Sequence, residues 1–264
     1  MKKAIIFLDI DGTLISEDGK RYLPDSAREA IARARKKGNL VFINTGRVII
    51  NVDPFIREVG FDGFVCGCGT YITFHDDVVF KHELESDYCK QIAKINYECG
   101  HFSLYEAWDL NSIDGRLKSG KMAYELIEYF KENGRPFLSD VESPDFHFDK
   151  FTAWFDEDSD HKRFVEGISD RFTYIDRGPG FCEIVPKGFS KASGIDFLLK
   201  KLNIPREDSY AFGDSNNDLD MLRFAGHSVV MEKASDSLKS MAEFVTGDVY
   251  DDGIYNAFLE LDLI

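Results

Sequence analysis

Short apolar runs alternate with helical stretches along the chain, and this order predicts an α/β fold. The runs at 4–8 and 40–43 are continuous, which is typical of strands that are buried on both faces of a parallel sheet, and 209–212 is predicted to be a further short strand. Between the first two runs, a predicted helix begins at Pro24 and ends before Gly38, with basic residues in its last turn. This strand–helix–strand order predicts parallel strands whose carboxyl ends meet at one edge.

The pattern changes twice after the second strand. Residues 61–81 predict short strands, with a hairpin around His75-Asp76-Asp77. Residues 84–185 then alternate helical stretches with strand-like ones and have their own apolar positions, which predicts an inserted α+β domain. We therefore expect a Rossmann-like, doubly wound parallel sheet core at 1–83 and 186–264, with an insertion at 84–185.

Polar residues follow three of the predicted core strands. Asp9 and Asp11 follow the first strand, Thr45 follows the second, and Asp214 and Asp218 follow a later one. Ligands of open α/β sheets bind at this edge, and side chains two apart on an extended segment point the same way. Asp9 could therefore be a nucleophile or a metal ligand, and Asp11 a proton donor. Taken alone, the first pair also fits a polar turn.

Four carboxylates at one edge would repel each other unless a cation joined them. Mg²⁺ suits such a group because it prefers oxygen ligands and often binds together with substrate phosphate. Donors for phosphoryl oxygens are the Thr45 hydroxyl, the Gly46 N–H group, Lys191 and Asn217. The pattern therefore predicts a site for a phosphate ester and Mg²⁺.

Composition narrows the classes of partner. The formal net charge of -15 opposes binding to nucleic acid and to anionic membranes. Five scattered cysteines are an odd number and do not indicate a disulfide framework, and Cys66-x-Cys68 is interpreted as a pair of buried strand thiols rather than a metal site. The leading apolar run stops at Asp9, too early for a secretion signal, and no run approaches the roughly 18 residues of a membrane span. We expect a cytoplasmic protein without a membrane partner.

These residues, in this order, resemble the four motifs of the haloacid dehalogenase (HAD) superfamily. The motifs are matched by Asp9-x-Asp11-Gly12-Thr13, by Thr45 within Asn44-Thr45-Gly46-Arg47, by Lys191, and by Gly213-Asp214-Ser215-x-Asn217-Asp218. The insertion after the second motif and the segment Val185-Pro186-Lys187-Gly188-x-Ser190-Lys191 resemble the Cof-type phosphatases of this superfamily. The likeness is close over 1–83 and 186–264, whereas the insertion matches in position and size only.

The resemblance implies a role for each matched residue. Asp9 would attack phosphorus and form an aspartyl-phosphate, and Asp11 would serve as acid and then as base. Mg²⁺ would be held by the Asp9 side chain, the Asp11 backbone carbonyl and Asp214, with Asp218 orienting water or Lys191. Thr45, Gly46, Lys191 and Asn217 would hold the phosphate of a small phosphorylated metabolite, such as a sugar phosphate.

The same resemblance leaves alternatives and shows departures. The acid at position 11 favours a phosphatase or phosphomutase over a dehalogenase. A phosphotransferase, or a phosphate-binding regulatory protein with little turnover, remains an alternative, and the oligomeric state is not indicated. Asn44 stands where the family usually has alanine, and we expect this change to have no effect. Cys66-Gly67-Cys68-Gly69-Thr70 replaces an Asn-Gly-Ala type loop, and Arg47 is interpreted as a surface or structural cation.

Overall fold

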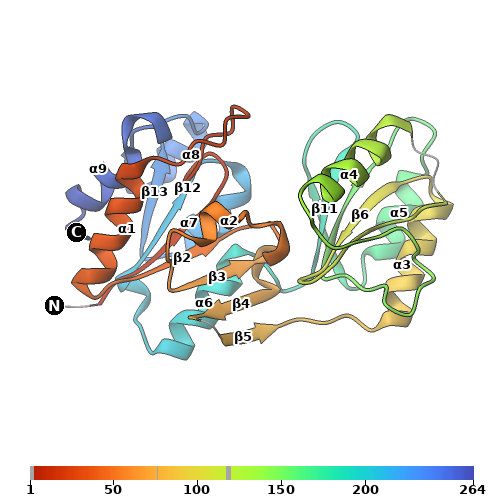
Figure 1. Ribbon diagram of the computed structural model, residues 1–264, viewed down its shortest axis with the longest axis horizontal. Coiled ribbons are helices and arrows are strands. Elements are labelled where there is room, and N and C mark those ends of the chain that lie inside the picture. Colours follow the sequence, from red (N-terminus) through yellow and green to blue (C-terminus); the bar gives the residue numbers. More distant parts are fainter. Residues whose placement is uncertain (1–2, 76, 117–119) are drawn as a thin grey trace. The chain divides into compact units, whose positions relative to one another are not determined.

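The chain divides into two compact units (Figure 1). The computed structural model describes residues 3–75, 77–116 and 120–264. The core unit comprises the chain up to Arg47, Val52–Phe80 and Phe189–Ile264. The inserted unit comprises Lys81–Gly188 together with the short segment Val48–Asn51, which precedes the insertion in sequence.

The core unit is built on one eight-stranded sheet in the order β14-β13-β12-β1-β2-β3-β4-β5. The pairs from β14 to β3 are parallel, whereas β4 pairs antiparallel with β3. Strands β1 and β2 are completely buried, as their apolar runs predict. The strands are β1 (Ile5–Leu8), β2 (Leu40–Asn44), β3 (Gly63–Cys66), β4 (Tyr71–Phe74), β5 (Asp77–Lys81), β12 (Ser209–Gly213), β13 (His227–Met231) and β14 (Phe244–Thr246).

Helices cover both faces of this sheet. Apolar residues of α6, α7 and α8 pack with Phe7 and Phe42 on one face. On the other face, Phe258 of α9 contacts Phe212 of β12. The core helices are α1 (Asp25–Lys37), α2 (Pro54–Arg57), α6 (Lys191–Leu202), α7 (Leu219–Phe224), α8 (Asp236–Met241) and α9 (Gly253–Glu260). This doubly wound α/β arrangement confirms the predicted fold class.

The inserted unit has a six-stranded sheet of its own in the order β10-β11-β9-β6-β7-β8. Its pairs are antiparallel except for the parallel pair of β7 and β8. Aromatic residues such as Tyr105, Phe148 and Phe151 form its main hydrophobic core. The elements are α3 (Ser86–Glu98), β6 (Phe102–Glu106), β7 (Asn111–Ile113), α4 (Gly120–Glu132), β8 (Phe137–Leu138), β9 (Lys150–Trp154), α5 (His161–Ile168), β10 (Phe172–Asp176) and β11 (Phe181–Pro186).

The strands that carry the predicted site lie where the sequence pattern predicts them. The sequence pattern did not predict several short elements. Strands β4 and β5 are neighbours, as the hairpin predicts, while Asp76 of its turn lies outside the described residues. Helices α7 and α8 and strand β14 are too short to give a clear periodic signal. Among the described residues, every helix is too short or too polar to cross a lipid bilayer.

Candidate active site

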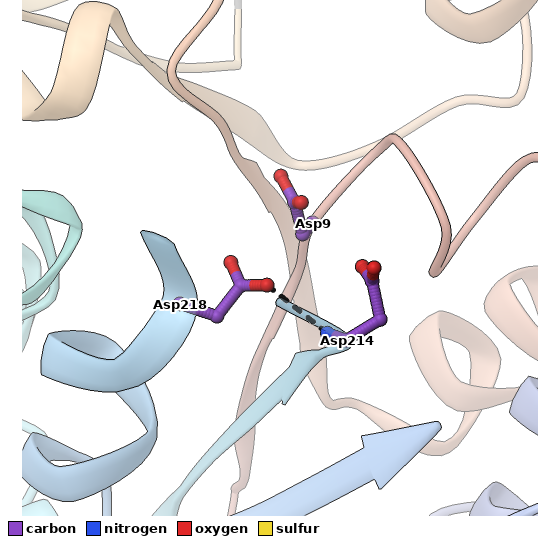
Figure 2. A group of neighbouring side chains, drawn as sticks. All are labelled: Asp9, Asp214 and Asp218. Carbon is purple, nitrogen blue, oxygen red and sulfur yellow. Dashed lines mark hydrogen bonds between the residues drawn. The ribbon is translucent and has the colours of Figure 1, made fainter. Parts of the chain in front are cut away.

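Three carboxylates meet at the carboxyl ends of two adjacent parallel strands. Asp9 follows β1, Asp214 follows β12, and Asp218 ends the short 3-10 turn Asn216–Asp218. Strands β1 and β12 pair in parallel with Leu8 opposite Phe212, which brings the segments beyond them together. Oxygen atoms of the three side chains lie within 4.8 Å of one another (Figure 2). Asp9 and Asp218 are buried, and Asp214 is half-buried.

The surroundings of this acidic group disfavour negative charge. Burial, with the neighbouring carboxylates of Asp218 and Asp214, raises the pKa of Asp9 well above its ordinary value. Burial and the charge of Asp218 raise the pKa of Asp214 to about 7. The hydroxyl of Thr13 donates to Asp214 Oδ1 at 2.9 Å and holds this side chain in place. A cation close to these oxygens would therefore stabilise the ionised carboxylates.

Lys191 supplies a fixed positive charge between two of the carboxylates. Its Nζ lies 2.7 Å from Asp9 Oδ1 and 2.6 Å from Asp218 Oδ1, and the residue is 2% exposed. Burial lowers its pKa, but the charges of Asp218 and Asp9 outweigh this effect and raise it, so the side chain is an ammonium. Lys191 opens α6 directly after Ser190, whose hydroxyl forms a capping box with Ser193.

Asp218 uses both of its oxygens inside the protein. While Oδ1 accepts from Lys191, Oδ2 accepts from the backbone N–H groups of Asp214 at 3.0 Å and Ser215 at 3.1 Å. Figure 2 draws the bond from Asp214. These contacts fix the loop after β12 and the ammonium group together.

Asp11 does not join the acidic group. Its carboxylate accepts from Nε of Arg47 at 2.8 Å and also contacts Nη2 of that residue. Arg47 Nη1 reaches Asp53 Oδ2 at 3.0 Å, and burial of the guanidinium is offset by the charges of Asp11 and Asp53, which raise its pKa. Among the described residues, the possible metal group therefore holds three carboxylates where the sequence led us to expect four. Arg47 is therefore a structural cation at the site, which agrees with one of the two roles expected for it.

The remaining predicted residues lie on the two loops beside the acidic group. Thr45 is buried, its N–H donates to Val65 at 2.9 Å, and its hydroxyl accepts from the N–H of Arg47 at 3.2 Å. Gly46 and Asn217 are half-buried, and Asn217 Oδ1 accepts from the hydroxyl of Ser215 at 2.6 Å. Thr45 and Gly46 thus follow β2, next to Asp9 on the neighbouring strand.

Similarity to known proteins points to one family. A profile described as haloacid dehalogenase-like hydrolase matches residues 6–258. "Putative phosphatase YkrA" of Bacillus subtilis (strain 168) is 30% identical over the whole of both chains. The 5-amino-6-(5-phospho-D-ribitylamino)uracil phosphatase YwtE of the same organism is 26% identical, with 94% of each chain covered. The solved structure of the HAD subclass IIB sugar phosphatase BT4131 is 28% identical, with a TM-score of 0.80 and full coverage of both chains.

The chain belongs to the haloacid dehalogenase-like hydrolases. In this HAD-like hydrolase, the acidic group suits a divalent cation, because its three carboxylates offer oxygen ligands and because burial and neighbouring carboxylates raise the pKa values of Asp9 and Asp214.

Sequence reasoning missed two residues at this HAD-like site. Thr13 was matched to the first motif but was given no role, yet its hydroxyl donates to Asp214. Asn44 was expected to have no effect, and its side-chain amide donates to the backbone carbonyl of Lys191 at 2.9 Å. A polar residue at the end of an otherwise apolar strand was the signal that could have identified Asn44.

The cysteine-containing loop of this hydrolase packs beside Thr45. Cys68 has a positive φ of 56°, and its N–H donates to the Thr45 carbonyl at 3.1 Å. All five cysteines are free and buried, as predicted for Cys66 and Cys68, although Cys68 lies in the turn Gly67–Gly69 rather than in a strand, and burial raises the pKa of the Cys66 thiol. The loop supports the second motif through its backbone.

Proposed function

We propose that this protein is a Mg²⁺-dependent phosphatase that hydrolyses a small phosphorylated metabolite through an aspartyl-phosphate on Asp9. The similarities to known proteins show that the chain is a phosphatase enzyme of the HAD family. The main support for the proposed Mg²⁺ dependence and aspartyl-phosphate is the contact of Lys191 Nζ with Asp9 and Asp218, beside Asp214. This arrangement joins a nucleophile, a phosphate-binding cation and a set of metal ligands.

In the first half-reaction, a carboxylate oxygen of Asp9 attacks phosphorus and the bond from phosphorus to the leaving oxygen breaks. Protonated Asp11 gives its proton to that oxygen, so an alcohol leaves. A carboxylate is a suitable nucleophile because its acyl-phosphate is open to a second displacement. Asp11 can act in this way once its carboxylate has left the ion pair with Arg47 and taken up a proton from solvent, a proton that the second half-reaction then restores.

In the second half-reaction, water attacks the phosphorus of the aspartyl-phosphate. Asp11, now a carboxylate, takes a proton from that water, and the bond from phosphorus to the Asp9 oxygen breaks. Inorganic phosphate leaves and Asp9 is restored. Splitting hydrolysis into two displacements lets one residue serve as acid and then as base.

The other residues of the site would bind the metal ion and the phosphoryl group and fix their positions. Asp9, Asp214 and the backbone carbonyl of Asp11 would hold Mg²⁺, while Asp218 would keep Lys191 in place through the bond at 2.6 Å. When bound, the cation would neutralise charge on the phosphoryl oxygens. Thr45, Gly46, Lys191 and Asn217 would donate to those oxygens, which favours a trigonal phosphoryl group held in line.

The substrate class follows from the relatives and from the presence of an insertion. BT4131 is named as a sugar phosphatase, and YwtE as a phosphatase of a phosphorylated ribitylamino compound. We propose a sugar phosphate or similar phosphomonoester as the substrate of this chain. We further propose that residues 84–185 act as a cap domain that selects the leaving group.

The first test is hydrolysis of an aryl phosphate by the wild type and by Asp9→Asn. The wild type should need Mg²⁺ and lose activity in EDTA, and Asp9→Asn should lose more than about 1,000-fold because the amide cannot attack. Asp62→Asn is a matched control, because Asp62 is a buried carboxylate that accepts from Arg35 at 3.0 Å and from the N–H of Val41 at the opposite end of the sheet.

Three outcomes would contradict the proposal. Full activity of Asp9→Asn would exclude the aspartyl-phosphate. A folded wild type that binds Mg²⁺ and inorganic phosphate but hydrolyses no ester in a panel would favour the regulatory alternative. Transfer of phosphate to an added alcohol, detected by product analysis, would identify a phosphotransferase.

A further inference from the structure

Asn44 is a completely buried amide at the active-site end of β2. It follows four apolar residues, and its whole side chain is shielded from solvent. Its Nδ2 donates to the backbone carbonyl of Lys191 at 2.9 Å and lies 3.5 Å from the sulfur of Met221. Its Oδ1 has no hydrogen-bond partner among the described residues.

Such a side chain is costly for the core. A buried amide whose oxygen lacks a partner loses its hydration without full compensation. An apolar side chain would avoid this cost, and the rest of β2 is apolar. The bond to Lys191 is therefore the contact that distinguishes asparagine from an apolar residue at this position.

The bond reaches the base of the side chain that carries the positive charge of the site. Lys191 is the first residue of α6, and its carbonyl oxygen has two lone pairs, so it can accept from Asn44 as well as within the helix. The ammonium group of Lys191 is separated from that backbone by a flexible four-carbon chain. Because the backbone of Lys191 is fixed, its side chain loses less conformational entropy when the ammonium group contacts Asp9 and Asp218.

A second contact restrains the same turn from another element. A Cβ placed on Gly69 would lie 2.7 Å from the carbonyl oxygen of Ser190, so the loop after β3 packs directly on the start of α6. That loop is itself bonded to Thr45 through the N–H of Cys68. The loop restrains α6 by contact, whereas Asn44 restrains it by a directed hydrogen bond.

We propose that Asn44 is a positioning residue for Lys191, which ties the end of β2 to the first turn of α6 and so sets the ammonium group between Asp9 and Asp218. The inference rests on the proposed function for the role of Lys191 in binding phosphate. Its structural part, the placement of Nζ, can be tested independently of turnover.

Asn44→Leu is the decisive variant because leucine has a similar shape but cannot donate. Loss of one buried hydrogen bond should lower kcat/KM for an aryl phosphate by about tenfold, and weaken inhibition by inorganic phosphate in Mg²⁺ by a similar factor. In a crystal structure of Asn44→Leu, the distances from Lys191 Nζ to Asp9 and Asp218 should lengthen. In a Lys191→Met background, Asn44→Leu should cause little further loss of phosphate binding.

Asn39→Leu is the matched control. Asn39 precedes the other end of β2 and is also buried; its Nδ2 donates to the Leu263 carbonyl at 2.9 Å, and its Oδ1 accepts from the N–H of Ala4 at 3.0 Å. This variant should lose thermal stability and keep kcat/KM within about twofold, because it changes a comparable bond away from Lys191.

The outcomes separate the inference from the function on which it rests. An Asn44→Leu protein with wild-type kcat/KM, phosphate inhibition and Nζ position would overturn the inference, as would equal loss of activity in Asn39→Leu. If the wild type has no phosphatase activity, the proposed function fails, and the crystal structure of Asn44→Leu still decides whether Asn44 positions Lys191.

Discussion

Gly12 permits the acidic group to form because it has no side chain. Its φ of +78° lies in the region that favours glycine. A Cβ built on Gly12 would lie 2.3 Å from Asp214 Oδ2, far inside van der Waals contact. The loop after β1 and the loop after β12 can therefore approach each other only with glycine at this position.

Gly12→Ala should displace Asp214 and weaken the binding of Mg²⁺. We expect kcat/KM to fall at least about tenfold and the Mg²⁺ concentration for half-maximal activity to rise, since one proposed ligand would be moved. Gly19→Ala is the control, because Gly19 has a similar φ of +82° but nothing within 4 Å of its added Cβ. Both variants should lose about 1 kcal/mol from backbone strain. Equal Mg²⁺ requirements in the two would show that Gly12 matters for backbone conformation only.

At the scale of elements, the start of α5 is held by a pair of histidines in the inserted unit. His101 is buried just before β6, and its Nε2 lies 3.1 Å from Nδ1 of His161, the first residue of α5. Its ring stacks on Phe164 with centroids 4.2 Å apart. Burial, together with the charge of His161, lowers the pKa of His101 to about 4.

This histidine pair predicts acid sensitivity of the inserted unit. Because the folded pKa of His101 lies below its ordinary value, the neutral ring contributes stability above about pH 6.5, and this is lost as the pH falls towards 4. The loss should be roughly 2 kcal/mol after allowance for solvent screening. Urea unfolding followed by tryptophan fluorescence measures it, because the only two tryptophans, Trp108 and Trp154, lie in this unit.

His101→Asn should flatten this pH dependence, because asparagine can still donate to the Cys99 carbonyl but does not titrate. His75→Asn, at an exposed turn of the core unit, is the control and should keep the wild-type slope. If His101→Asn loses stability between about pH 7 and about pH 4.5 as steeply as the wild type, the pair does not cause the acid sensitivity.

At the scale of the whole molecule, negative charge is in excess, and one cluster of three carboxylates lies in the core unit. The formal net charge is -15. Asp9, Asp214 and Asp218 all belong to the core unit, so folding brings three carboxylates together against their repulsion. Lys191 offsets part of this repulsion, and a bound cation would offset more.

Mg²⁺ should therefore stabilise the folded protein. At about 100 times its dissociation constant, a ligand specific to the folded state adds about 2.7 kcal/mol. The thermal midpoint should rise with Mg²⁺ and fall with EDTA, measured against NaCl at matched ionic strength, because screening also stabilises an acidic protein. Asp214→Asn should respond much less. Identical midpoints in Mg²⁺ and EDTA would contradict a metal site in the folded chain.

The sequence determined the arrangement of the core and the residue types of the site. Short apolar runs predicted buried strands of a parallel sheet, and parallel strands present the residues that follow them, Asp9, Thr45 and Asp214, at one edge. Motif order then identified the family, which the comparisons confirm. Element boundaries followed from strong local signals such as Gly38, which ends α1 with a φ of +101°.

Tertiary structure alone decided which of these residues touch. Asp11 is two residues from Asp9, yet its carboxylate pairs with Arg47 rather than joining the acidic group, because a guanidinium and a carboxylate form a two-point contact. Asn44 and Lys191 are 147 residues apart, and their bond exists because β2 and the start of α6 meet in space. Spacing along the chain fixes which face a side chain occupies, whereas hydrogen-bond partners depend on atomic distances that only packing sets.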